Sequence, residues 1–210
     1  MEIIQLKGQI ELLSGLHIGG GDDTMKIGGI DNSVIKDANS GHPYIPGSSL
    51  KGKMRSLLEH HLRLVYLPSA DGSPFGSRLM DEVPEGVKRD ARTLLELFGD
   101  PNPESPYGIT RISVGDCHLC EESKEMELSE AKFENSINRK GGTALNPRQT
   151  ERVPAGVKFN YDIRIKVFDG DDREALEKMV ETAISLVEKD YLGGNGSRGY
   201  GRVRFIPQSE

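Results

Sequence analysis

One segment alternates apolar and polar side chains more strictly than any other, and it constrains the fold most. Over 157–167, six apolar residues occupy every second position and five polar residues stand between them. Successive side chains of a strand point to opposite faces, so this pattern predicts a strand with one buried and one exposed face. Residues 2–12 show the same period. The chain must therefore form a sheet that is covered on one side only.

Two helices are expected to cover that sheet. Residues 49–66 and 172–189 repeat apolar positions three and four residues apart, as an amphipathic helix does. Ser48 or Ser49 is expected to cap the first helix, and Asp171 with Glu174 to begin the second. The other expected elements are a short helix at about 90–98 and strands at 110–119 and 202–205.

The order of these elements predicts an α+β fold. Without insertions it is strand, helix, strand, strand, helix, strand, the ferredoxin-like βαββαβ arrangement shared by RNA-recognition (RRM-like) folds. The apolar share of 35% is low, which indicates long polar insertions around a modest core. We expect a single domain over 1–210, with insertions at about 14–45, 67–89 and 121–156.

Charge is unevenly distributed along the chain. Its 27 basic and 33 acidic residues give a net charge of −6, which argues against a simple basic nucleic-acid binder. Nevertheless, 43–57, 135–158 and 191–205 are locally basic, whereas 121–134 and 171–190 are acidic. Such blocks indicate distinct faces with distinct partners, and the acidic blocks are candidates for docking neighbouring subunits.

The sequence favours a cytoplasmic location. It has neither a membrane-length apolar run nor a signal-peptide pattern at its start. Its two cysteines, Cys117 and Cys120, are too few for a disulfide framework. Their C-x-x-C spacing alone is weak evidence for zinc. His61 follows the apolar stripe of its helix, so we expect it to be buried rather than a ligand.

Three motifs together are specific. L-H-I-G-G-G leads into G-G-I-D-N-S within 16–33, P-Y-I-P-G-S-S-L-K-G-K-M-R occupies 43–55, and G-G-N-G-S-R-G-Y-G-R-V occupies 193–203. In this order and spacing they resemble the RAMP superfamily of CRISPR-associated proteins. The chain particularly resembles the repeating backbone subunit of type III-A (Csm) effector complexes. The resemblance covers nearly the whole chain, including L-F-G at 97–99 and E-R-V-P-A-G at 151–156.

The resemblance implies an RNA-guided nuclease. Copies of such subunits line up as a filament on a guide RNA (crRNA) with other subunits of the complex. A thumb-like hairpin, matched by the insertion at 121–156, crosses the guide–target duplex, and 67–89 would be a lid loop. Target RNA is cut at regular intervals, once per subunit, in a metal-dependent reaction. The family's essential carboxylate corresponds to Asp31.

The chemistry of such a cut is compatible with an aspartate. The adjacent 2′-OH must attack in line with the leaving 5′-oxygen, and positioning supplies much of the rate. An ordinary Asp is a poor base at neutral pH. We therefore expect Asp31 to anchor a weakly held divalent metal, with Mg²⁺ expected, or a hydrogen bond; no organic cofactor is expected. Asp22 and Asp23 are competing carboxylates, and an Asx-turn is the structural alternative for Asp31.

Candidate RNA-binding residues come from the three motifs and the thumb. Ser48, Ser49, Lys51 and Arg55 begin a helix, whose free N–H groups and dipole favour phosphate. His17 matches a family position that holds guide RNA, and glycines permit close approach of the RNA backbone. The remaining candidates are Gly19, Gly20, Arg139, Arg148, Gly194, Gly196, Ser197 and Arg198. Ile137 or Leu145 is a candidate wedge between base pairs.

Three alternative functions remain open at this point. The chain could be a non-catalytic RNA-binding scaffold, or a single-copy RAMP endoribonuclease that processes precursor guide RNA. The latter normally needs general acid–base groups, for which His17 alone is slight support. A mononucleotide site is disfavoured because no G-x-x-x-x-G-K-[ST] motif is present.

Overall fold

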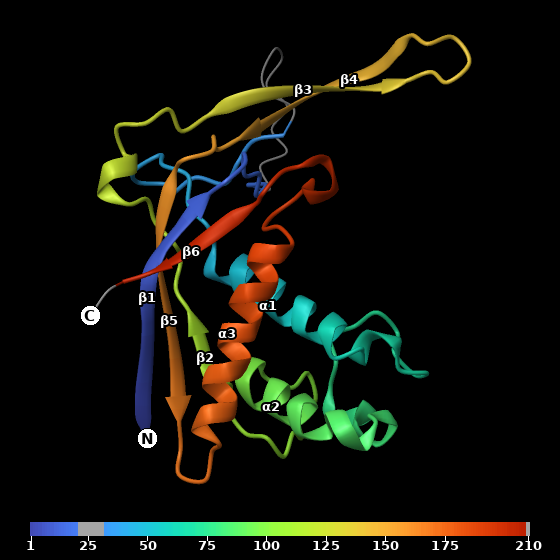
Figure 1. The fold of residues 1–210 in the computed structure, drawn as a ribbon, viewed down its shortest axis with the longest axis vertical. Coiled ribbons are helices and arrows are strands. Elements are labelled where there is room, and N and C mark those ends of the chain that lie inside the picture. The colour runs from blue at the N-terminus through green and yellow to red at the C-terminus, as the bar shows by residue number, and fades with distance from the viewer. Residues whose placement is uncertain (21–31, 209–210) are drawn as a thin grey trace.

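A four-stranded antiparallel sheet organises the chain, whose computed structural model describes residues 1–20 and 32–208 (Figure 1). The strands stand in the order β2-β5-β1-β6. The central pair is β1 (Glu2–Leu12) and β5 (Lys158–Val167), flanked by β2 (Ile112–Val114) and β6 (Val203–Pro207). The strict alternation of β5 buries every second side chain, from Phe159 to Ile165, as its period predicts.

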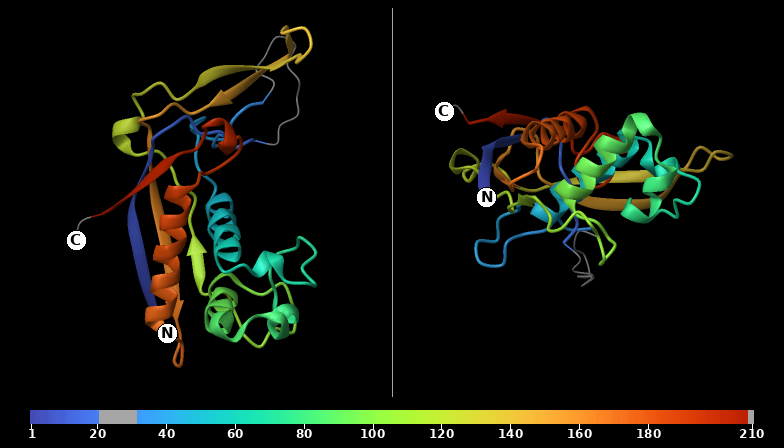
Figure 2. Two further views of the ribbon diagram at one scale, coloured as in Figure 1. Left: turned by 45° about the vertical axis from the view of Figure 1, so that its right-hand side comes forward. Right: turned by 90° about the horizontal axis from the view of Figure 1, so that it is seen from below.

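Two helices cover one face of this sheet, as Figure 2 shows. They are α1 (Gly47–His61) and α3 (Arg173–Lys189), which pack on each other, and α2 (Lys88–Phe98) packs beside both. Their buried apolar residues join those of the strands in one core. Removing α2 and the insertions leaves β1-α1-β2-β5-α3-β6, so the expected ferredoxin-like α+β fold is confirmed.

A second, two-stranded sheet extends away from the helices (Figure 1). It is the antiparallel hairpin of β3 (Glu130–Ile137) and β4 (Ala144–Arg152), interrupted by a bulge between Glu134 and Ser136. It lies within the insertion expected at 121–156. Short 3₁₀ helices complete the structure at Leu64–Tyr66, Ser77–Glu82, Glu85–Val87, Glu121–Ser123 and Gly196–Arg198.

The first helix starts earlier than the sequence predicts. Pro46 precedes it, and the two serines expected as caps lie inside it. Asp116 instead accepts a hydrogen bond from the Gly47 N–H at 2.8 Å. A side chain at position 47 would meet the carbonyl oxygen of Val114 at 2.2 Å, so glycine is required where the helix meets β2. The helix ends at His61 rather than 66, because Arg63 takes a left-handed conformation with φ 62°.

Three other sequence predictions also need correction. Asp172, not Asp171, caps α3, accepting from the Ala175 N–H at 3.1 Å. Asp171 pairs with Arg111 at 3.0 Å and so joins the end of β5 to the start of β2. The strand expected at 110–119 is shorter, because its second half makes only isolated bridges. His61 is exposed at the end of α1 rather than buried.

The contact between α1 and the sheet predicts a large effect of Leu50→Ala. Leu50 is fully buried, so truncation should lower the free energy of unfolding by about 2–5 kcal/mol. Ile3→Ala is the control, because Ile3 is 53% exposed and its loss should cost no more than ~0.5 kcal/mol. Urea unfolding of both variants measures the difference. Equal effects would contradict the packing described.

Candidate nucleic-acid interface

A polar groove lies where the base of the hairpin meets two glycine-rich loops. Its volume is about 420 Å³. Four segments far apart in the sequence form it: the first glycine loop, the residues after position 31, the hairpin strands, and the last glycine loop. The lining residues are His17, Gly19, Asn32, Glu134, Arg148, Thr150, Gly194, Asn195 and Arg198. The groove thus brings together five of the predicted RNA-binding residues.

The His17 side chain is held by a fixed hydrogen bond. Its Nδ1 lies 2.7 Å from the carbonyl oxygen of Glu151. A carbonyl can only accept, so Nδ1 carries the proton and Nε2 is not used by this bond. The carbonyl of His17 accepts from the Gly194 N–H at 2.8 Å. A side chain at Gly193, which has φ +74°, would stand 2.4 Å from that same carbonyl. The two glycine loops therefore need glycine to approach this closely.

Glu151 joins the segment after position 31 to the hairpin. Its buried carboxylate accepts hydrogen bonds from the Val34 N–H at 2.9 Å and from Lys36 and Ser129, both at 2.7 Å. Its own N–H donates to the carbonyl of Asn32 at 2.9 Å. Burial by itself raises the pKa of Glu151, but these hydrogen bonds outweigh it and the net pKa is lowered. The ionised carboxylate thus holds one side of the groove.

The last glycine loop is braced from two sides. A side chain at Gly196 would lie 2.0 Å from the ring of Tyr191, which is why glycine stands there. Lys53 of α1 lies 3.8 Å from the centre of that ring and pairs with Asp190 at 2.6 Å. Asn195 adopts φ 61°, a left-handed conformation that Asn tolerates better than most residues.

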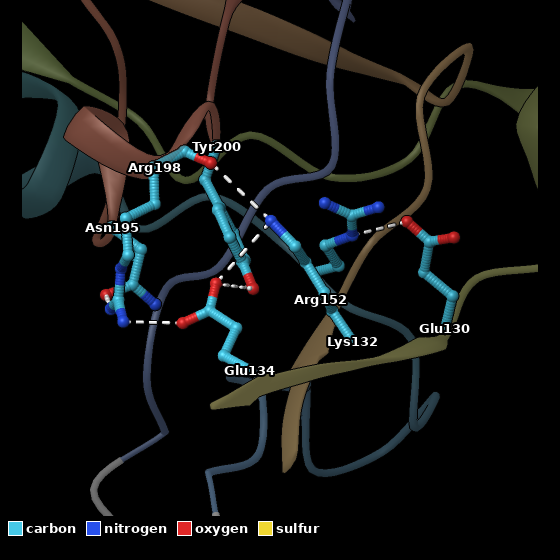
Figure 3. A network of polar contacts seen from close by, with 7 residues as sticks. All are labelled: Glu130, Lys132, Glu134, Arg152, Asn195, Arg198 and Tyr200. Carbon is cyan, nitrogen blue, oxygen red and sulfur yellow. Dashed lines mark hydrogen bonds and ion pairs between the residues drawn. The ribbon is translucent and has the colours of Figure 1, made fainter. Parts of the chain in front are cut away.

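A cluster of polar side chains ties this loop to the hairpin, as Figure 3 shows. The carboxylate of Glu134 on β3 accepts hydrogen bonds from Arg198 and from the hydroxyl of the buried Tyr200, the latter at 3.1 Å. Lys132 lies 3.5 Å from the same carboxylate. The Arg198 guanidinium also donates to the side chain of Asn195. Arg198 is therefore oriented by the protein itself.

The residues of α1 that were predicted to bind RNA do not line the groove. Arg55 pairs with Glu59 at 2.8 Å and donates to the carbonyl of Phe75 at 2.7 Å, which gives it a structural role. Burial, and then the charge of Arg55, lower the pKa of Lys51. Ser48 is exposed and Ser49 half-buried. Asp116 already binds the first N–H of this helix, so the helix end is less open to phosphate than the sequence predicts.

Other predicted residues flank the groove, lie at the turn of the hairpin or fall outside the described ranges. Gly20 is exposed next to Gly19, Gly196 and Ser197 follow Asn195, and Arg139 lies at the exposed turn of the hairpin. Asp31, like its competitors Asp22 and Asp23, lies outside the described residues. Asn32, which follows Asp31 in the sequence, lines the groove. The candidate wedge residues Ile137 and Leu145 are exposed, and so is Phe133 at 70%.

Metal ligands do not cluster in the part of the chain that the structure describes. No group of three His, Cys, Asp or Glu side chains there could hold an ion. Cys117 and Cys120 are buried free thiols, and burial raises the pKa of Cys117 to about 12 and that of Cys120 to about 11. Buried neutral thiols act as small apolar side chains. Zinc binding by these cysteines therefore gains no support from their surroundings.

Comparison with known proteins places the chain in a family. The model of the RAMP superfamily matches residues 9–204. A protein of Enterococcus italicus named CRISPR system Cms endoribonuclease Csm3 is 40% identical over 212 residues, covering 98% of this chain and 91% of that protein. A protein of the same name from Methanocaldococcus jannaschii is 41% identical over 204 residues, covering 95% and 77%. The chain belongs to the Csm3 family of the RAMP superfamily.

Solved structures of this RAMP family have the same fold. The Methanopyrus kandleri Csm3 crystal structure matches with a TM-score of 0.64 at 26% identity, covering 98% of this chain and 75% of that one. A Csm3–Csm4 subcomplex of the type III-A CRISPR-Cas interference complex matches with a TM-score of 0.57 at 30% identity, covering 97% and 75%. The expected resemblance is therefore confirmed along the length of the chain.

Sequence reasoning missed four residues that line the groove, Asn32, Glu134, Thr150 and Asn195, and the buried Glu151 beside it. Glu134, Thr150 and Glu151 lie in the insertion at 121–156, where no clean period assigned strands. A signal for Asn195 was present, because Asn between glycines favours a left-handed turn. Glu151 was visible only as the single acid within a basic block.

The position of Glu151 predicts an acid-dependent loss of stability. At pH 7, Glu151→Gln should lower the free energy of unfolding by about 1–3 kcal/mol, because it disturbs a buried acceptor with three donors. The folded pKa lies below the unfolded value, so this contribution is complete above about pH 4.3 and fades as the pH falls through the folded pKa. Urea unfolding between pH 3 and pH 7 measures it.

Glu121→Gln is the matched control for that experiment. The side chain of Glu121 is 86% exposed, and within the described part of the chain its carboxylate pairs with Lys124 alone, so its removal should leave the profile unchanged. A difference between wild type and Glu151→Gln that stays constant down to pH 3 would contradict the role of the ionised carboxylate.

Proposed function

We propose that this chain is a guide-RNA-binding backbone subunit of a type III-A CRISPR interference complex and an endoribonuclease that cleaves bound target RNA at regular intervals. The names of its curated relatives support the activity. The observation that carries the proposal is the groove, which joins His17, Arg148, Arg198 and the glycine loops on one surface. A backbone subunit needs such a surface to hold one strand of RNA.

The chemistry of the groove suits a sugar–phosphate backbone. Arg148 and Arg198 supply guanidinium groups, which bind phosphate through several N–H donors. The glycines at 19 and 194 lack side chains, so RNA can reach the peptide groups there. His17 can stack on a base or bond to the RNA through Nε2. Contacts of this kind do not read base identity, as guide strands of varied sequence require.

Partners follow from the same assignment. We propose guide and target RNA, further copies of this chain along the guide in a filament, and other subunits of a type III-A complex. The Csm3–Csm4 subcomplex supports a contact with a second kind of subunit. In the described residues no helix is long and apolar enough to span a membrane. We propose a cytoplasmic location, because Cys117 and Cys120 are free thiols.

Asp31 is proposed as the catalytic carboxylate. The resemblance to the RAMP superfamily implies an essential carboxylate at this position, and Asn32 next to it lines the groove. The chain would act by holding the target so that a 2′-OH lies in line with the leaving 5′-oxygen. A divalent metal, with Mg²⁺ expected, would supply charge stabilisation when bound. Since Mg²⁺ often binds through one carboxylate and RNA phosphates, a cluster of protein ligands is not required.

Asp31→Ala tests this proposal directly. Complexes assembled with the variant should bind guide and target RNA as wild type does but lose target cutting by at least about 100-fold, since the carboxylate acts only in the chemical step. Gel analysis of end-labelled target with Mg²⁺ measures the fragments. EDTA should stop the wild-type reaction, and added Mg²⁺ should restore it.

Asp37→Ala serves as the control, because Asp37 is a half-buried residue whose carboxylate, among the described residues, accepts hydrogen bonds from the local turn at 39–40. It should cut normally. Full cutting by Asp31→Ala would overturn the assignment, and loss with Asp22→Ala or Asp23→Ala instead would move it to that residue. If the wild-type complex binds target RNA but does not cut it, the chain would be a non-catalytic RNA-binding scaffold.

A further inference from the structure

Among the described residues that line the groove, one side chain is acidic and the others are neutral or basic. Glu134 faces the groove together with His17, Arg148 and Arg198. It lies directly opposite Arg148 in the register of β3 and β4. A carboxylate in a phosphate-binding surface repels RNA unless its charge is used by the protein. Its contacts therefore decide what it does.

The charge of Glu134 is fully used within the protein. One carboxylate oxygen accepts from Arg198, and the other accepts from Tyr200 at 3.1 Å and faces Lys132 at 3.5 Å. Its side chain is only 16% exposed, whereas that of Arg198 is 46% exposed. Figure 3 shows the side chain of Glu134 reaching from β3 toward the loop, with the Arg198 guanidinium beside its carboxylate. The acid is thus shielded and the guanidinium remains accessible.

Arg198 keeps donors for a ligand in this arrangement. A guanidinium has five N–H groups, and the described residues engage two of them, one through Glu134 and one through Asn195. These two bonds fix the plane of the group. A pre-oriented guanidinium loses less conformational entropy when it binds phosphate than a free side chain does. The same carboxylate fixes Tyr200, which follows the loop, so the loop and the hairpin share one anchor.

We propose that Glu134 is a positioning residue for guide RNA: it holds Arg198 in the orientation that binds a phosphate and fixes the terminal glycine loop against the hairpin. This inference rests on the proposed function, because it assumes that the groove binds the guide. Glu134 itself does not touch the RNA. Its effect on RNA affinity should therefore pass through Arg198, and it should depend on the length of the side chain as well as on its charge.

The test measures binding of a fluorescently labelled single-stranded guide RNA to the full chain by anisotropy. Glu134→Gln should weaken binding about 3- to 10-fold, a typical coupling between contacting residues. Glu134→Asp keeps the charge but shortens the side chain, and should also weaken binding. Arg198→Ala should weaken it at least as much. Adding Glu134→Gln to Arg198→Ala should change affinity less than about 2-fold, because the residue through which Glu134 acts is gone.

Glu130→Gln is the matched control. Glu130 lies on the same strand but pairs with Arg152 rather than Arg198, so its substitution should leave affinity within about 2-fold of wild type. Thermal unfolding checks that each variant is folded. If Glu134→Gln does not fold, Glu134→Asp in the wild-type and Arg198→Ala backgrounds gives the same comparison.

Four results would overturn the inference. Tighter or unchanged binding by Glu134→Gln would mean that the carboxylate competes with phosphate or plays no part. Additive losses in the double variant would mean that it does not act through Arg198. Unchanged binding by Arg198→Ala would overturn this inference and also the proposal that the groove binds the guide RNA. A loss with Arg198→Ala but not with Glu134→Gln or Glu134→Asp would remove the inference alone.

Discussion

The attachment of β4 to the two loops beside it determines the shape of the whole interface. Glu151 binds Val34, Lys36 and Ser129 through its carboxylate, and Asn32 and His17 through its peptide groups. One residue thus places three walls of the groove. A hairpin that extends from the core could otherwise pivot at its base. This buried carboxylate, ionised and fully bonded, makes that base rigid.

The same construction explains why the groove, and not the sheet, is the better surface for RNA. RNA-recognition folds often stack bases on aromatic residues of the open sheet face. Here the aromatic residues of the four strands, Phe159, Tyr161 and Phe205, are all buried under the helices. On the open face, Arg164 pairs with Asp162 and Arg204 with Glu11. By contrast, the groove offers oriented guanidinium groups and glycine-lined loops.

The core of the fold could be predicted from the sequence because burial on one face leaves a period. This holds for β1, β5 and α3, whose exposed and buried sides differ in polarity. The hairpin could not be assigned in this way, because most of its residues are exposed on both faces. The start of α1 was misplaced because a tertiary contact, Asp116 with Gly47, replaced a local cap.

The site was predictable only in part, for a related reason. Motifs located His17, Gly194 and Arg198, and the thumb insertion supplied Arg148, but residue type does not show which cations the protein itself uses. Arg55 meets an acid inside the fold. Arg198 also meets an acid, but it stays accessible in the groove. The distinction depends on partners such as Glu59 and Glu134, which lie outside the three motifs.

Electron cryomicroscopy of the full chain bound to guide RNA tests the central claim most directly. The account predicts that the RNA backbone lies in the groove, with phosphates within hydrogen-bond distance of Arg148 and Arg198 and the RNA in contact with His17. RNA that instead lay across the open face of the sheet, over Gln5, Lys7 and Arg164, would contradict it.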